Sequence, residues 1–181
     1  MSAQNCEILL SGTGGQGLIL AGQILAEAVI RDGKNAIQTQ SYGPEARGGA
    51  SRAEVIISDG DIDYPLITKP DVLLAMSRQA LEKFIGKLDE NSILMVDSTH
   101  IEEIPPTAAR IFKTPYSKIA RELGKEMVAN VVALGALAAA TGVVTKESLT
   151  AALMSRIPRG TEALNQKALE IGWNSADQSA A

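Results

Sequence analysis

The sequence predicts a three-layer α/β/α fold with a mostly parallel sheet, a Rossmann-like first βα unit and a helical C-terminal part. Short aliphatic runs alternate with helix-like stretches in the first half of the chain, and a glycine-rich segment follows the first run. The last third is rich in alanine, valine and leucine. A length of 181 residues suits one domain, so we expect residues 1–181 to fold as a single unit.

The first half of the chain supplies five predicted strands and two helices. Each predicted strand is a short apolar run, and several are bounded by glycine, aspartate or proline. The first helix has Leu18, Leu25 and Val29 on one face and ends at Gly33. The predicted strands are 8–10, 36–41, 53–58, 72–76 and 93–96, and the predicted helices are 15–32 and 79–88.

The C-terminal third predicts three helices. Residues 118–141 form one long predicted helix, in which Gly135 allows a neighbouring element to approach closely. Helices at 146–155 and 161–172 follow, and residues 174–181 are expected to be a frayed tail. A long helix rich in alanine and valine should leave apolar surface for other chains to cover, so we expect the isolated chain to form a homo-oligomer.

The composition excludes several classes of function. Seventeen basic and twenty-one acidic residues give a net charge of −4, which does not favour binding to bulk nucleic acid or anionic membranes. The longest apolar run, 131–140, is too short to span a bilayer, and no signal peptide is visible, so we expect a cytoplasmic protein. Cys6 and His100 are the only cysteine and histidine, so no disulfide, zinc site or iron–sulfur site is expected.

A glycine-rich segment between the first strand and the first helix is a candidate anion-binding site. It has the pattern G-x-G-x-x-G and consists of Gly12, Thr13, Gly14, Gly15, Gln16 and Gly17. Such glycines permit a tight turn, and N–H groups at a helix start attract phosphate. The alternative is a packing turn that binds nothing. A simple NAD site is disfavoured, because the second strand ends without a carboxylate and Asp32 precedes that strand.

A second loop, 41–52, joins the second and third predicted strands. It contains three glycines, one proline and two arginines, and its candidate ligand-binding residues are Tyr42, Gly43, Arg47, Gly48, Gly49 and Arg52. Ligands bind at the carboxyl ends of strands in α/β sheets, so we expect this loop to lie beside the glycine loop. Its arginines could hold a phosphate or carboxylate, contact another subunit, or pair with acids such as Glu45 and Glu54.

These two loops resemble those of the gamma subunits of 2-oxoacid:ferredoxin oxidoreductases. The similarity covers essentially the whole chain, from residue 6 to about residue 172, and includes the strand that follows Pro70 and Asp71. The form of the segment 41–49 is more similar to 2-oxoglutarate or branched-chain members than to pyruvate members.

The resemblance implies a non-redox subunit that is inactive by itself and has no catalytic residue. Enzymes of the family decarboxylate a 2-oxoacid, reduce ferredoxin and transfer the acyl group to coenzyme A. Thiamine diphosphate, Mg²⁺ and [4Fe-4S] clusters belong to the alpha, beta and delta-type subunits. In single-chain relatives, both loops help to hold coenzyme A. Those relatives have lysines about where this chain has Glu45 and Ala46, and Arg47 is the nearest replacement.

Two other functions remain open from the sequence: a purely structural docking subunit, and a free-standing nucleotide-dependent oxidoreductase. Four polar residues outside the loops are expected to be structural. We expect Cys6 to be a small buried side chain and His100 to lie at the surface or at an interface. Asp97 is expected to cap a turn, and Asn130 to be a buried amide that fixes helix packing.

Overall fold

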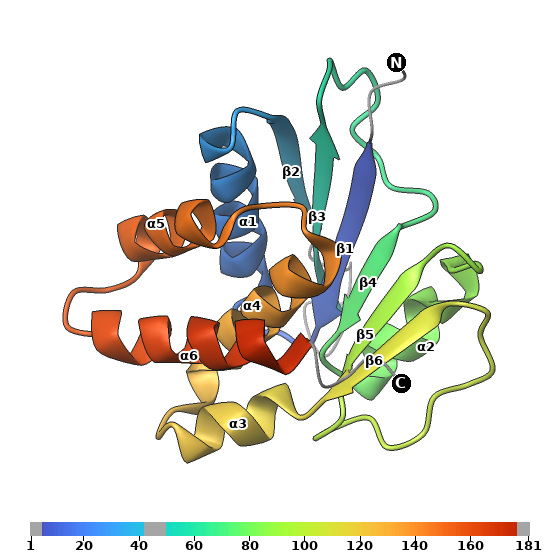
Figure 1. The fold of residues 1–181 in the computed structure, drawn as a ribbon. Coiled ribbons are helices and arrows are strands. Elements are labelled where there is room, and N and C mark those ends of the chain that lie inside the picture. Colours follow the sequence, from blue (N-terminus) through green and yellow to red (C-terminus); the bar gives the residue numbers. More distant parts are fainter. Residues whose placement is uncertain (1–4, 42–49, 177–181) are drawn as a thin grey trace.

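A six-stranded sheet with helices on both faces forms the centre of the computed structural model, which describes residues 5–41 and 50–176 (Figure 1). The strands are β1 (Cys6–Gly12), β2 (Asn35–Ser41), β3 (Ser51–Ser58), β4 (Val72–Ala75), β5 (Ile93–Asp97) and β6 (Arg110–Thr114). Their order across the sheet is β2-β3-β1-β4-β5-β6. β3 is antiparallel to β1 and β2, and the other neighbouring pairs are parallel. The predicted α/β class and mostly parallel sheet are therefore confirmed.

The helices form two unequal layers on this sheet (Figure 1). They are α1 (Leu18–Arg31), α2 (Arg78–Phe84), α3 (Tyr116–Glu122), α4 (Ala129–Thr141), α5 (Lys146–Arg156) and α6 (Glu162–Ser175), with short 3₁₀ turns η1 (Ile85–Lys87) and η2 (Glu126–Val128). α2 lies on one face of the sheet, and the thicker layer of α1, α3 and α4 lies on the other. α5 packs on α1, and α6 packs on α4.

α4 is the central helix of the thick layer. Its residues 129–138 are all buried, as expected for a helix that is apolar on every side. α6 crosses α4 at a close contact in which a side chain at Gly172 would overlap the backbone of Val132, and one at Gly135 would overlap that of Leu169. The expectation that this helix leaves apolar surface for other chains is therefore wrong, because the chain's own α6 covers it.

The single helix predicted at 118–141 is also wrong. α3 ends at Glu122, and the chain then passes through Gly124, whose φ of 102° is rarely adopted by other residues. The short turn η2 follows before α4 begins. Gly124 thus separates two helices that the continuous run of helix-forming residues around it suggested were one.

β6 was missed by the sequence analysis. It is an edge strand with exposed Arg110 and Lys113, so it lacks the apolar run by which the other strands were recognised. At the C-terminal end, α6 continues to Ser175, so residues 174 and 175 do not belong to a frayed tail. Residues 177–181 of that tail lie outside the described residues. Among the helices that the structure describes, none is long and apolar enough to cross a membrane.

Glu27 connects α1 to α5 through a cluster of charged hydrogen bonds. Its carboxylate accepts from Arg31 at 2.8 Å, from the Ser155 hydroxyl at 2.9 Å and from Arg156 at 2.6 Å. The Arg31 hydrogen bond is the main cause that lowers the pKa of Glu27 to about 2, against the opposing effect of burial. The ionised form is therefore bound more strongly in the folded chain than in the unfolded chain.

We expect Glu27→Gln to lower the stability of the chain at neutral pH by about 1 kcal/mol, because solvent screens this partly exposed cluster. A depressed carboxyl pKa contributes stability above the unfolded value of 4.5, and this is lost as the pH falls through about 2. Urea unfolding should therefore show a difference between wild type and variant at pH 7 that shrinks below pH 4.5. Glu170→Gln is the matched control, because the Glu170 side chain is 57% exposed and its ion pair with Lys146 is screened by solvent. A pH-independent difference would contradict this account.

Candidate functional site

The glycine loop, 12–17, is held in a fixed shape by the side chain of Gln16. Its Oε1 accepts a hydrogen bond from the Thr13 N–H at 2.8 Å, and its Nε2 donates to the Met76 carbonyl at 3.1 Å. Because Met76 follows β4, these bonds fasten the loop to the neighbouring strand. Gly14 and Gly15 are exposed, and their N–H groups have no hydrogen-bond partner among the described residues. The loop thus offers pre-positioned backbone donors, as anion sites at strand-to-helix turns do.

The end of the loop is fastened to α4. Asn130, which is 4% exposed, donates from Nδ2 to the Gly17 carbonyl at 3.0 Å and accepts from the Val131 N–H at 2.9 Å. This confirms the expectation of a buried amide that fixes helix packing. Gly17 has a φ of 71° and caps α1 without a side-chain hydrogen bond, so α1 begins at Leu18 and not at the predicted residue 15.

Asp32 lies at the far end of α1 and has a structural role. Its carboxylate accepts from the Thr145 N–H and from the Thr145 hydroxyl, both at 2.7 Å, at the start of α5. Burial raises the pKa of Asp32, but hydrogen bonds from Ser148 and Thr145 outweigh it and lower the pKa overall. This carboxylate is therefore committed to capping α5 and is remote from the glycine loop, as predicted from its place before β2.

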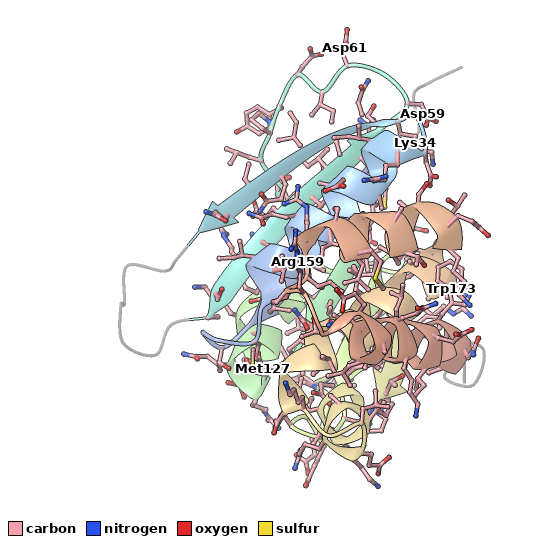
Figure 2. The ribbon with its side chains drawn as sticks, turned by 90° about the vertical axis from the view of Figure 1, so that its left-hand side faces the viewer. Lys34, Asp59, Asp61, Met127, Arg159 and Trp173 are labelled. Atoms are coloured by element: carbon pink, nitrogen blue, oxygen red, sulfur yellow. The ribbon has the colours of Figure 1, made fainter. Side chains whose placement is uncertain are left out.

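A cavity of about 600 Å³ opens beside the glycine loop, at the carboxyl ends of the parallel strands. The exposed Met127, 83% accessible, lies at its rim (Figure 2). Other wall residues come from the glycine loop, from the segments after β4 and β5, and from α3, η2 and α4. They are Thr13, Gly14, Gly15, Gln16, Met76, Ser77, Arg78, His100, Ser117, Glu126 and Ala129.

Asp97 holds the wall residue Ser117 in position. It is fully buried at the end of β5, and its Oδ2 accepts from the Ser117 N–H at 3.1 Å and from the Ser117 hydroxyl at 2.5 Å. Its Oδ1 accepts from the Thr99 N–H at 3.0 Å. The expectation that Asp97 caps a turn is confirmed. Both carboxylate oxygens of Asp97 are engaged by Thr99 and Ser117, so it does not form a triad with His100.

Among the described residues, three charged or titratable side chains line the cavity: Arg78, His100 and Glu126. His100, 40% exposed, lies 3.8 Å from Glu126, which also lies 3.5 Å from Arg121. Arg78 stands at the start of α2 and pairs with Glu82 at 2.8 Å while remaining 49% exposed. Arg78 and the glycine loop line the same cavity, so its walls offer both a guanidinium and backbone N–H groups to an anionic ligand. His100 was expected at a surface or interface, and a surface position is what the structure gives it.

The second loop begins and ends beside the glycine loop. Ser51 of β3 pairs with Gly12 of β1, and Ser41 of β2 pairs with Arg52. Both strand ends therefore lie at the edge of the sheet that carries the cavity. The predicted residues Tyr42, Gly43, Arg47, Gly48 and Gly49 lie outside the described residues.

Of the three alternatives for the loop arginines, the structure shows Arg52 paired with a nearby acid. Its Nη1 lies 3.5 Å from Oε1 of Glu54, whose other oxygen accepts from the Thr39 hydroxyl at 3.0 Å. Arg52 does not line the cavity described above. Glu54 is buried, so Arg52 neutralises a carboxylate that is shielded from solvent.

Cys6 is half-buried at the start of β1. Burial, reinforced by the nearby Asp71 carboxylate, raises the pKa of its thiol to about 12, so the thiol stays protonated near neutral pH. Within residues 5–41 and 50–176, no group of three or more histidine, cysteine, aspartate and glutamate side chains is placed to hold a metal ion.

Comparison with known proteins decides the family. A model of the pyruvate ferredoxin/flavodoxin oxidoreductase family matches residues 7–175. The chain belongs to this family. The 2-oxoglutarate synthase subunit KorC of Methanocaldococcus jannaschii is 46% identical over 176 residues, which are 95% of this chain and 94% of that protein.

Solved structures agree with the family assignment. The gamma subunit of a keto/oxoacid ferredoxin oxidoreductase from Geobacter sulfurreducens matches with a TM-score of 0.92 at 47% identity, over 99% of this chain and all of that chain. The 2-oxoglutarate:ferredoxin oxidoreductase of Magnetococcus marinus shares the fold, with a TM-score of 0.88 at 24% identity, over 98% of this chain and 32% of that chain. The predicted resemblance to gamma subunits is confirmed.

Arg78, Ser117 and Met127 are cavity residues that sequence reasoning missed. Arg78 follows the correctly predicted strand at 72–76, so the rule that ligands bind at strand carboxyl ends could have found it. Ser117 follows β6, which was not predicted, and Met127 lies in the break within the expected long helix. For these two residues the sequence carried no usable signal.

Proposed function

We propose that this chain is the non-redox subunit of a 2-oxoacid:ferredoxin oxidoreductase that acts on 2-oxoglutarate, and that it holds part of coenzyme A. The observation that carries this proposal is the cavity of about 600 Å³ between the glycine loop and Arg78. Coenzyme A carries a pyrophosphate and a 3′-phosphate, which need backbone N–H donors and guanidinium groups. The exposed N–H groups of Gly14 and Gly15 supply the first, and Arg47 and Arg78 the second.

In the part of the chain that the structure describes, the cavity has the features of a binding surface, with exposed backbone donors and a guanidinium in its walls. Among the described residues, Asp97 is occupied by Ser117 and Thr99, and the Cys6 thiol is protonated and far along the sheet from the cavity. The residues of this chain would therefore bind and orient coenzyme A while the reaction takes place in other chains. The Magnetococcus marinus protein, which has the same fold, was solved with 2-oxoglutarate, coenzyme A and succinyl-CoA bound.

Alpha, beta and delta-type subunits would complete the enzyme in the cytoplasm, with ferredoxin as electron acceptor. They would hold thiamine diphosphate, Mg²⁺ and [4Fe-4S] clusters, which supply decarboxylation and electron transfer. The composition of this chain supports that division, because Cys6 is its one cysteine. A free-standing nucleotide-dependent oxidoreductase is disfavoured, since Asp32 is bound to Thr145 and β2 brings no carboxylate to the glycine loop.

Steady-state kinetics of the reassembled complex test the proposal. We expect Arg47→Ala to raise the KM for coenzyme A roughly ten- to hundredfold, the loss of one charge-assisted contact of about 1–3 kcal/mol. The KM for 2-oxoglutarate should change little, because the 2-oxoacid would react in other subunits. The pure chain, assayed with 2-oxoglutarate and a dye acceptor, should show no turnover.

Arg159→Ala is the matched control, since Arg159 is an exposed arginine in the turn between α5 and α6 (Figure 2). It should leave both KM values unchanged. An intact Arg47→Ala complex with an unchanged dependence on coenzyme A would assign the second loop to subunit docking, which is the structural alternative.

A further inference from the structure

The two edges of the sheet differ in their protection against further strand pairing. β6 is five residues long, carries the exposed Arg110 and Lys113, and is followed directly by Pro115. Charged side chains, prolines and short length are the usual devices that keep an edge strand from pairing. β2 has none of them: its seven residues contain no charge and no proline, and all seven pair with β3 without a bulge.

A groove follows the free side of β2. Two shallow depressions of about 370 and 400 Å³ lie along this strand, and both are lined by Ile30 of α1 and Ala36 of β2. Ile30 is 59% exposed and is the most exposed large apolar side chain in the walls of the two depressions. Lys34 and Asp61 lie at the end where β2 begins (Figure 2).

We infer that two copies of this chain pair through β2, antiparallel about a twofold axis near Ile37, so that one sheet continues through both copies. A twofold contact places the same patch on both sides, so the patch must be complementary to itself. β2 meets this condition, because its side chains are all uncharged and no antiparallel register sets like charges opposite each other. A charged segment of another protein would find no opposite charge on β2 to pair with.

The residues of α1 beside β2 are compatible with the same axis. The second depression places Glu27 and Ile30 beside Ala36 and Gln38, close to the middle of β2. A twofold axis there brings Ile30 toward Ile30 of the second copy. The Glu27 carboxylate is already paired with Arg31 and Arg156 of its own chain, so the contact brings no unpaired carboxylates together. The contact would bury the one large apolar side chain of the groove that is mainly exposed.

Sedimentation equilibrium of the isolated full chain tests the pairing. We expect a dimer that Ile30→Lys weakens at least tenfold, because two lysines would meet near the axis and the apolar contact would be lost. Leu66→Lys is the matched control: Leu66 is 51% exposed but lies outside the groove, so its substitution should leave the dimer intact. A monomeric wild type, or equal dissociation constants for wild type and Ile30→Lys, would overturn the inference.

Cysteine cross-linking tests the register independently of stability. With Cys6→Ala as background, a cysteine in place of Ile37 would face its own copy across the axis, at the separation that allows a disulfide. Oxidation should then give a covalent dimer, whereas Leu66→Cys should not. A dimer in sedimentation that does not cross-link at position 37 would overturn the inference, because the contact would then lie elsewhere. Cross-linking of position 37 to a different subunit in the reassembled complex would assign the β2 edge to that subunit.

Discussion

Gly172→Ala is expected to destabilise the chain by about 3 kcal/mol or more, even though alanine is the better helix former by about 1 kcal/mol. A Cβ atom at this position would overlap the carbonyl group of Val132 in α4. The obstacle is backbone within a buried helix, so the clash can be relieved only by moving α6 away from α4. That movement would open the contact around Gly135 and Leu169 and weaken the core of the thick layer.

Urea unfolding followed by circular dichroism measures this effect. Gly86→Ala is the matched control, because a Cβ atom at Gly86 would have no atom within 4 Å and the residue lies in the short turn η1. Its stability should stay within about 0.5 kcal/mol of wild type. If Gly172→Ala were as stable as Gly86→Ala, the close α4–α6 contact would not exist in solution.

The contact between α4 and α6 also shows what the sequence could and could not predict about the fold. The uniform apolar character of 129–138 indicated a helix that must be covered on all sides, and Gly135 indicated a close neighbour. Neither signal indicates which element packs against this helix. Whether α6 or another chain covers α4 depends on the path of the chain through α5, which no local pattern indicates. The break at Gly124 was likewise concealed by a continuous run of helix-forming residues. Local sequence patterns predicted most of the helices and strands, but they did not predict which of these elements pack together.

The site divides in the same way. The glycine loop was predictable because its chemistry lies within six consecutive residues between a strand and a helix. The opposite walls of the cavity are tertiary: Arg78, His100 and Ser117 reach it from three different strand ends, and Ser117 is held by the buried Asp97. Fastening of the loop by Gln16 and Asn130 is likewise visible only in three dimensions, although Asn130 was recognised as a buried amide.

Gly14 gives the sharpest test of how a ligand approaches the loop. It is the second glycine of the pattern G-x-G-x-x-G, the position where the backbone comes closest to a bound phosphate. It is exposed, and a Cβ atom there would meet no heavy atom of the described residues within 4 Å. A larger side chain at this position should therefore leave the fold unchanged and occupy only the space that the ligand needs.

We expect Gly14→Val to raise the KM for coenzyme A roughly a hundredfold in the reassembled complex, more than Arg47→Ala, because it excludes the phosphate from the backbone donors instead of removing one contact. Its unfolding free energy should stay within about 0.5 kcal/mol of wild type, and the KM for 2-oxoglutarate should change little. Gly86→Val, which also meets no neighbouring atom, controls for the added bulk and should bind coenzyme A normally. A stable Gly14→Val subunit that assembles and keeps the wild-type KM for coenzyme A would show that no phosphate approaches this loop, because a Cβ atom at Gly14 has no other atom of the described residues within 4 Å.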